Sequence, residues 1–578
     1  MADVNREKLM RRDFLKSVLA GIPAFALDWD SFPRGDAARV GGESGRGGRT
    51  SGSSGGGDST AATAAGSPDG PWDAVIIGAG LGGLSCAAAF ARQGFKPLVL
   101  EQHSVPGGYA TTFKRPGGYV FDVSLHSTSV GERAGVANLI QGFPEIDDIK
   151  FVPHKVLYRA VFPEHDIRVP HRDPDGYFRM LAGLFPEEKE GLEKLYQTMT
   201  GLISDLTRYS EAAAGGKINM ATVPKDFPSL FQCFSSTWGR VQDSYLKDPK
   251  LKGIITALWG YFGLPPSKLA SLYYIMPVVG YLRDGGYYPV GKSQAMSDAF
   301  VRMIEKRGGK VRLQARVTKI LVKDHAAYGV QTEDGTEYTA KAIVSNANAY
   351  DTVRTMMDEG EFLKEYLARM DKFTASLSSF QVFLGLKKDL VGKAGIKDTE
   401  LFWYPDYDHE GGYRACLEGD VEKGGFGVTL YDNLYPGYSP KGKNTVNLMT
   451  LQGYEPWKKY ETDYFAGKKD AYRAEKKRMA DIMIAKAEAA FLPGLRDAIE
   501  VIEIGTPLTN VRYTGNYRGA IYGWDQTLDN VEPRRLGHKT PIKNLYLAGA
   551  WTRPGGGYGA VIPSGLQCFG EIMEDWKG

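Results

Sequence analysis

The stretch WDAVIIGAGLGGLSCAAAFARQGFKPLVLE, from Trp72 to Glu101, decides the fold. Its run AVIIG is apolar and rich in β-branched residues, which predicts a buried parallel strand. LSCAAAFARQG predicts a helix that stops at Gly94, and KPLVLE predicts a second buried strand that ends at Glu101. A strand, a glycine turn, a helix and a strand in this order predict an α/β protein with a Rossmann-type domain.

The glycines between the first strand and the helix form the pattern G-x-G-x-x-G at Gly78, Gly80 and Gly83. The first permits a tight turn, the second lets a pyrophosphate approach the backbone, and the third lets the helix pack close to the strand. Glu101 follows Gly83 by 18 residues, near the spacing of a carboxylate that binds ribose hydroxyls. The pattern predicts a dinucleotide site at a helix N-terminus, with a ligand-free glycine turn as the weaker alternative. It does not separate FAD from NAD.

The composition is that of a folded protein with a large core. The chain has 578 residues, 43% of them apolar, and a formal net charge of +3. This length predicts two or more domains. The nearly balanced charge, without a basic stripe, predicts no nucleic-acid partner. The four cysteines form no CxxC pair, so we expect neither a metal site nor a disulfide framework.

The first 70 residues are predicted to lie outside the folded domains. Residues 1–30 contain LMRRDFLKSVLAGIPAFAL, whose paired arginines and short apolar run are typical of an export signal. RRDFLK is similar to the twin-arginine signal, with a chance arginine pair on an amphipathic helix as the alternative. Residues 31–70 are rich in Gly, Ser, Ala and Thr, which predicts a disordered linker. We therefore expect export through the twin-arginine machinery, to the periplasm or a membrane-associated location.

After Glu101 the chain continues QHSVPGGYATTFKRPGGYVFDVSLHS, with Gly107 and Gly108 near its start and His126 near its end. This segment resembles the flavoprotein superfamily of phytoene desaturases, carotenoid isomerases, retinol saturases and amine oxidases. In those proteins the paired glycines lie against the FAD phosphates and ribityl chain. The ending FD…H is more similar to the carotenoid isomerase and retinol saturase branch. The resemblance implies that the cofactor is FAD.

Later segments carry the same resemblance. GGYYPVGKSQ, from Gly285, is similar to the family's YPxGGSQ, although Lys292 stands where a second glycine is usual. This departure puts the backbone conformation at that point in question. Val317 falls in RVTKI, where the family makes a backbone contact to the adenine. AKAIVSNANAYDT, from Ala340, is similar to another strand and turn of the family.

The C-terminal segment IKNLYLAGAWTRPGGGYGAVIPSGLQCFGEI, from Ile542 to Ile572, resembles the family's closing motif. NLYLAG predicts a buried strand, PGGGYGA a loop with exposed backbone N–H groups, and VIPSGLQCFGEI a helix. The resemblance places Gly549 and Ala550 at the pyrophosphate and ribityl chain, and residues 558–561 near the flavin. The complete set of predicted FAD contacts is Gly78, Ala79, Gly80, Gly82, Gly83, Glu101, Gln102, Gly107, Gly108, Thr111, Val317, Gly549, Ala550, Tyr558, Gly559, Ala560 and Val561.

The predicted architecture is a Rossmann-type FAD-binding domain of the glutathione reductase kind, split in the sequence, with an inserted α+β substrate domain. We expect the FAD-binding parts over 71–127, 285–350 and 506–578, and the substrate domain over 128–284 and 351–505. A second strand-linked G-x-G-x-x-G is missing from the sequence, which argues against an NAD(P)H domain. The electron donor or acceptor is therefore left open.

The sequence contains no Ser/His/Asp constellation that indicates catalysis. His126 is the candidate catalytic residue, facing the flavin or the substrate, and a structural histidine is the alternative. Arg553 is interpreted either as a contact to the flavin or substrate or as a surface cation. LKGIITALWGYFGLPPSKLASLYYIMPVVGYLRDGGYY predicts helices packed in the substrate domain, with a lipid-facing entrance or a polyene tunnel as the alternative.

The resemblance implies an FAD-dependent oxidoreductase that exchanges a hydride at flavin N5 with an apolar, unsaturated substrate of the carotenoid, retinoid or isoprenoid kind. Desaturation, saturation and isomerisation remain open. The first alternative is a flavin amine oxidase, and the second is a non-enzymatic binding protein similar to prenyl-protein escort proteins. The expected partner is an apolar small molecule, together with peripheral contact to a membrane.

Overall fold

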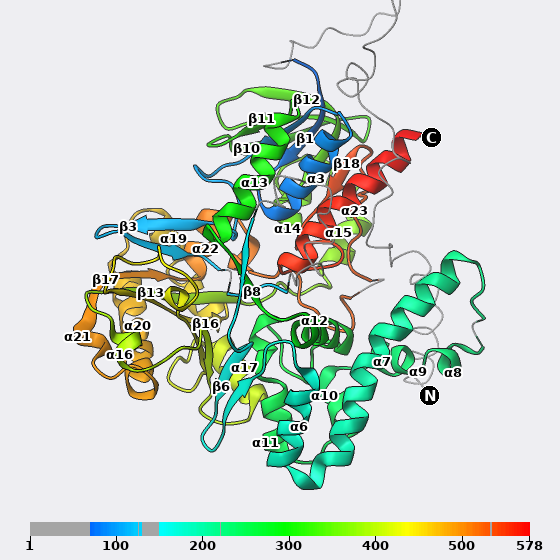
Figure 1. The fold of residues 1–578 in the computed structure, drawn as a ribbon. Helices are drawn as coiled ribbons and strands as arrows, with labels where there is room; N and C mark the ends of the chain where they lie inside the picture. The colour runs from blue at the N-terminus through cyan, green and yellow to red at the C-terminus, as the bar shows by residue number, and fades with distance from the viewer. Residues whose placement is uncertain (1–69, 125, 130–148, 220, 532–533, 578) are drawn as a thin grey trace, which may run out of the picture.

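The computed structural model describes residues 70–124, 126–129, 149–219, 221–531 and 534–577. The predicted export signal and all but the last residue of the predicted linker lie outside these ranges. Figure 1 shows one sheet at the top of the molecule, a second at the lower left and a group of helices at the lower right. Within the described ranges, no helix combines the length and the apolar character that a membrane crossing requires.

The first sheet has the strand order β10-β11-β12-β1-β2-β9, and β18 also pairs with β12. The pairs among β18, β12, β1, β2 and β9 are parallel, whereas β10, β11 and β12 pair antiparallel. The bounds are β1 (Trp72–Ile77), β2 (Pro97–Leu100), β9 (Lys310–Arg312), β10 (Val317–Lys323), β11 (Ala326–Thr332), β12 (Glu337–Ser345) and β18 (Leu545–Leu547).

Helices cover both faces of the first sheet, and this explains why the strand AVIIG is apolar throughout. Ala74 and Ile76 of β1 share a core with three helices, whereas Val75 and Ile77 point into a second core with two others. The helices of the core that contains Ala74 and Ile76 are α3 (Leu81–Arg92), α13 (Lys292–Lys306) and α23 (Tyr558–Lys577), and Figure 1 shows them near one another. The helices of the core that contains Val75 and Ile77 are α14 (Ala349–Arg354) and α15 (Lys364–Met370).

The second sheet has the order β17-β13-β16-β15-β14-β6-β7. Its pairs are antiparallel except for β14 with β6. Helix α20 (Asp470–Ala490) packs on this sheet through Met479 and Met483. The strands are β6 (Tyr158–Val161), β7 (Asp166–Val169), β13 (Ser378–Leu386), β14 (Glu400–Trp403), β15 (Phe426–Thr429), β16 (Asn444–Gln452) and β17 (Ile499–Gly505).

The third part is a group of helices that shares one hydrophobic core with β6 and β7. The segment LKGIITALWGYFG and its continuation form α11, η3 and α12, as the sequence predicts. The helices are α6 (Pro174–Leu184), η2 (Pro186–Glu188), α7 (Lys189–Ala214), α8 (Val223–Asp226), α9 (Pro228–Phe234), α10 (Trp238–Asp243), α11 (Pro249–Ile255), η3 (Ala257–Tyr261) and α12 (Ser271–Asp284).

Short elements complete the fold. Two strand pairs join the parts: β3 (Thr112–Arg115) with β4 (Tyr119–Asp122), and β5 (Phe151–Pro153) with β8 (Tyr287–Pro289). The remaining helices are α16 (Leu390–Lys393), α17 (His409–Glu418), η4 (Tyr431–Asn433), α18 (Glu455–Lys458), α19 (Glu461–Phe465), α21 (Leu495–Ala498), α22 (Pro507–Thr514) and η5 (Tyr517–Gly519).

The predicted α/β class with a Rossmann-type sheet is confirmed. The first sheet draws its strands from three separate stretches of the chain, 72–100, 310–345 and 545–547. The second sheet draws its strands from 158–169 and 378–505. The domain boundaries given above stay predictions.

Candidate active site

One large cavity is bordered by both sheets and by α12. Its volume is about 1770 Å³. Ligand pockets for one small molecule usually occupy about 300–1,000 Å³. The cavity therefore has room for a dinucleotide and a second molecule at the same time.

Six glycines from three segments meet at one side of this cavity, and we call them the glycine cradle: Gly78, Gly80, Gly82, Gly107, Gly108 and Gly549. Gly80 and Gly107 form an isolated bridge, and the Gly107 N–H donates to the Ala79 carbonyl at 2.7 Å. A Cβ atom on Gly82 would lie 2.8 Å from the Cα of Gly549. The chain segments approach too closely for side chains here, so bare backbone is presented to a ligand, as a pyrophosphate requires.

The first turn of the motif has the conformation that its glycines predict. Gly78 has φ +93°, in the left-handed region that favours glycine. A Cβ atom on Gly83 would lie 2.3 Å from the Gly78 carbonyl oxygen, so only glycine lets α3 pack this close to β1. Gly80 is the N-cap of α3, and the N-terminus of that helix faces the cradle. Unpaired N–H groups and the helix dipole favour an anion at this point.

Asn346 contacts the glycine cradle and was not predicted from the sequence. Its Nδ2 lies 3.5 Å from the Gly78 carbonyl oxygen, and a Cβ atom on Gly80 would lie 2.7 Å from the same Nδ2. Asn346 also lines the cavity. The available signal was its position directly after β12, because the carboxyl ends of parallel β1 and β12 meet at one sheet edge.

Glu101 directly follows β2 and lines the cavity. Its carboxylate accepts hydrogen bonds from the Ala79 N–H at 2.7 Å and the His103 N–H at 2.8 Å. Burial raises the pKa of Glu101, and these backbone hydrogen bonds oppose the rise. The two bonds fix the side chain, and each oxygen keeps a lone pair. The predicted bond to ribose stays a prediction.

The closing segment differs from its prediction at one point. Helix α23 begins at Tyr558, so residues 558–561 form its first turn and not part of a loop. The Tyr558 hydroxyl donates to the Tyr109 carbonyl at 3.3 Å, which joins this turn to the segment after Gly108. First-turn N–H groups lack partners within their helix, so they are suited to bind anions or flavin carbonyls.

The structure brings most of the predicted cofactor residues to the cavity surface. Three do not line it: Ala79 donates to Glu101, Gly83 packs against Gly78, and Gly549 lies against Gly82. The lining residues are Gly78, Gly80, Gly82, Glu101, Gln102, Gly107, Gly108, Thr111, Val317, Ala550, Tyr558, Gly559, Ala560 and Val561. Arg553 forms an ion pair with Glu571 at 3.0 Å and does not line the cavity.

Lys292 has a left-handed backbone conformation of the kind that glycine adopts most easily. Its φ is +70°, and Gly291 before it has φ +93°. The Lys292 ammonium lies 4.4 Å from the ring centroid of Tyr438, a cation–π distance. The turn is therefore left-handed at Lys292, and the lysine side chain lies over an aromatic ring.

Another part of the cavity contains a few polar side chains among apolar ones. We call His126, Tyr261, Glu400 and Thr429 the polar cluster. The Tyr261 hydroxyl donates to Glu400 Oε2 at 2.6 Å. His126 Nδ1 lies 2.7 Å from Thr429 Oγ1 and 3.8 Å from Glu400 Oε1. All four residues line the cavity, so the structure brings the predicted His126 together with three residues that the sequence analysis did not identify.

Burial determines the charge of the polar cluster. It raises the pKa of Glu400 to about 8, although the hydroxyl groups of Tyr261 and Thr429 oppose the rise. It lowers the pKa of His126 to about 4. Desolvation disfavours the charged form of each group. At neutral pH the carboxyl is therefore largely protonated, the imidazole is neutral and the cluster carries little charge.

The walls near the polar cluster are apolar and aromatic. The His126 ring stacks on Tyr261, with ring centroids 6.3 Å apart and planes at 11°. The segment from Leu251 packs in the helical core, and some of its residues also line the cavity. The polyene tunnel and the lipid-facing entrance stay predictions. The apolar wall residues include Leu206, Phe234, Leu258, Phe262, Met276 and Phe402.

Two known proteins are similar to this chain over most of their length. Prolycopene isomerase 1 of an Oncidium hybrid cultivar is 27% identical over 518 residues, which cover 87% of this chain and 84% of that protein. All-trans-retinol 13,14-reductase of Danio rerio is 26% identical over 510 residues, which cover 82% of each.

Solved structures share the fold. An oxidoreductase from Methanosarcina mazei aligns with a TM-score of 0.57 and 17% identity, covering 87% of this chain and all of that one. Putrescine oxidase bound to putrescine aligns with a TM-score of 0.56 and 14% identity, covering 88% of this chain and 99% of that one.

The family assignment follows from a match across most of the chain. The sequence profile described as flavin containing amine oxidoreductase matches residues 81–568, from the start of α3 into α23. The expectations of an FAD cofactor and of an oxidoreductase are confirmed, and the escort-protein alternative is set aside. The chain belongs to the family of flavin-containing amine oxidoreductases.

Proposed function

We propose that this enzyme acts on an apolar, unsaturated substrate of the isoprenoid kind, such as a carotenoid or retinoid. The observation that carries the proposal is the single cavity that joins the glycine cradle to an apolar pocket. The names of the two relatives, an isomerase of prolycopene and a reductase of retinol, support the same substrate class. Desaturation, saturation and isomerisation share one requirement, which is a polyene held against a flavin.

The cradle residues fit the FAD that the family implies. Gly80, Gly82 and Gly108 leave the backbone bare for the pyrophosphate, and Glu101 is assigned to the ribose. The first turn of α23 is assigned to the flavin ring. Bound FAD supplies hydride exchange with the substrate. The protein positions the substrate, excludes water from the apolar pocket and holds the protons that the reaction requires.

An amine substrate is the second candidate, because the family name refers to amine oxidation. A substrate ammonium group needs a carboxylate or a cage of aromatic rings to replace its water. Glu400 lines the pocket, and burial raises its pKa to about 8, so most of this carboxyl is uncharged at neutral pH. A largely uncharged carboxyl at this position favours the polyene over an ammonium group.

The test uses the purified protein with its FAD. Oxidised and chemically reduced enzyme are mixed anaerobically with single carotenoids and retinoids, and the products are separated by chromatography while flavin absorbance is followed. A panel of primary and secondary amines is the control. We expect a change in double-bond number or geometry for at least one polyene. Amine-dependent flavin bleaching and peroxide release, with every polyene returned unchanged, would reject the proposal.

We also propose export by the twin-arginine route and peripheral contact with a membrane. RRDFLK in the first 30 residues supports export, and the apolar character of the substrate supports the membrane contact. The location of the full chain in cells is compared with that of a variant in which Arg11 and Arg12 are both replaced by Lys. Equal export of the two would contradict the proposal.

A further inference from the structure

Glu400 is a buried carboxyl group with one oxygen left unpaired. It is the first residue of β14, and the residue is 3% exposed. Oε2 accepts the hydrogen bond from Tyr261, whereas Oε1 has no hydrogen-bond partner among the described residues. A buried polar atom without a partner costs free energy, so such atoms often have a function. Glu400 is one of the residues that line the substrate pocket.

Among the described residues, no charged group compensates a negative charge on Glu400. Within the described ranges, the one ion-pair contact of Glu400 is His126, whose imidazole is neutral because burial lowers its pKa to about 4. The other titratable groups that influence the carboxyl are the phenols of Tyr261, Tyr281 and Tyr431. Burial raises the pKa of each phenol, so all three are neutral.

We propose that Glu400 is the catalytic acid of this enzyme and gives its carboxyl proton to a carbon of the polyene. The inference rests on the proposed function and specifies the direction in which the reaction runs. A carboxyl group that is protonated before the substrate arrives is prepared to add a proton. A desaturase requires a base that is prepared to remove one. The geometry points to saturation, or to isomerisation that begins with protonation.

The atoms and electrons of the saturation step balance. One alkene carbon receives the hydride equivalent that the cofactor supplies, and its neighbour receives the proton of Glu400. The π bond breaks, two C–H bonds form, and Glu400 is left as a carboxylate. A two-electron, two-proton reductant of the quinol class returns the electrons to the cofactor and releases the proton that restores the carboxyl. In isomerisation, the carboxylate takes the same proton back after rotation about the weakened bond.

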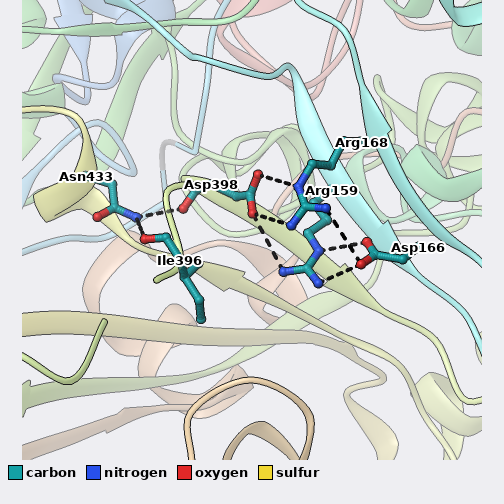
Figure 2. A network of polar contacts seen from close by, with 6 residues as sticks. All are labelled: Arg159, Asp166, Arg168, Ile396, Asp398 and Asn433. Atoms are coloured by element: carbon teal, nitrogen blue, oxygen red, sulfur yellow. Dashed lines mark hydrogen bonds and ion pairs between the residues drawn. The ribbon is translucent and has the colours of Figure 1, made fainter. Parts of the chain in front are cut away.

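A network of ion pairs fixes the strand that carries Glu400. Asp398, two residues before it, faces Arg159 of β6 and Arg168 of β7, with contacts of 3.6 Å and 3.2 Å (Figure 2). Arg159 also binds Asp166 at 2.7 Å. The Asn433 amide donates to the Asp398 carbonyl at 2.8 Å. This network is separate from the cavity and makes Asp398 a positioning residue for Glu400.

The experiment compares the holoenzyme with Glu400→Gln, which keeps the size and removes the acid. The first measurement is an infrared titration of the carboxylic C=O band, which needs no substrate. We expect a band that is present at neutral pH, decreases as the pH passes about 8, and is absent in Glu400→Gln. Asp525→Asn is the matched control, because Asp525 is buried, its pKa is raised to about 7 and it does not line the cavity.

The second measurement is a single turnover of reduced enzyme with a polyene in D₂O. We expect one deuterium on the product carbon, and a rate about 10²–10⁴-fold lower in Glu400→Gln, with FAD content and polyene affinity unchanged. Asp525→Asn should keep the wild-type rate. A Glu400→Gln rate equal to wild type, or no Glu400 band at neutral pH, overturns the inference while the proposed function stands. If the wild type converts no polyene, the proposed function fails, and with it this role of the proton.

Discussion

The glycine cradle and the polar cluster lie in one cavity but are built in opposite ways. The cradle is made of backbone, and its specificity comes from side chains that are missing, as at Gly80, Gly82 and Gly549. The polar cluster is made of side chains from four separate segments, and its properties come from burial. The difference teaches that cofactor binding depends on local chain geometry, whereas the substrate chemistry depends on how distant segments meet.

The strongest test of this comparison adds a side chain to the cradle. In Gly82→Val the new Cβ would lie 2.8 Å from the Cα of Gly549, and backbone cannot move away cheaply. We expect loss of most bound FAD, measured as the ratio of flavin to protein absorbance after desalting. Gly260→Ala is the control, because Gly260 lines the cavity and no atom lies within 4 Å of its added Cβ. A Gly82→Val protein with full FAD would mean that the cradle does not bind the cofactor.

A smaller effect should follow from filling the substrate pocket alone. Gly280 of α12 lines the cavity, and no atom lies within 4 Å of an added Cβ. Gly280→Phe is expected to weaken polyene binding about tenfold or more, equivalent to ~1.4 kcal/mol, and to leave FAD content unchanged. The dissociation constant from a fluorescence titration checks this. Gly183→Phe, on α6 and outside the cavity, should bind as the wild type does.

The ion pairs of Asp398 with Arg159 and Arg168 should stabilise the folded protein as well as hold Glu400 in place. Asp398 is 6% exposed, so Asp398→Asn removes a buried carboxylate from two arginines, which keep their contacts with Asp166. We expect a loss of about 1–3 kcal/mol, below the value for a fully buried pair because Arg168 is half exposed. Thermal unfolding measures the loss. Glu361→Gln, which disrupts an exposed pair with Lys364, should change the melting temperature little.

The smallest expected effect is a difference between the wild type and Glu400→Gln in how thermal stability depends on pH. Because burial raises the pKa of Glu400 from 4.5 to about 8, the folded state retains a proton that the unfolded state has lost between these values. The stability of the wild type should therefore fall as the pH rises through this window. Glu400→Gln lacks this titration, so its melting temperature relative to wild type should increase from about pH 6 to about pH 9. A constant difference would show that Glu400 is already ionised at neutral pH.

The sequence predicted the cradle well because its constraints are local. Glycines at fixed spacing after an apolar run have few alternative explanations, and the structure places Gly78, Gly80 and Gly83 at the predicted turn. The start of α23 was placed too late, because PGGGYGA is rich in glycine and gives no helix signal. Asn346 was missed although it follows a predicted strand.

The polar cluster was predicted only at His126. Glu400 stands at the start of the apolar strand ELFW, and Tyr261 lies in the aromatic run WGYFG. Neither has neighbours in sequence that suggest chemistry, and the pairing of β14 with β6 and the packing of η3 bring them together. The one available signal was a carboxylate within an otherwise apolar strand, which indicates a charged group that folding must bury or pair.

The order of synthesis gives the split sheet a consequence for biogenesis. Strand β18 pairs with β12, and Gly565 of α23 packs so closely on α3 that an added Cβ would lie 2.1 Å from the Gly82 carbonyl oxygen. A ribosome synthesises β18 and α23 hundreds of residues after β1, α3 and β2. The nascent chain must therefore keep β1, α3 and β2 without these partners while the intervening residues emerge. We expect stable cofactor binding only after both elements have been made, and a product that terminates before β18 cannot complete the site.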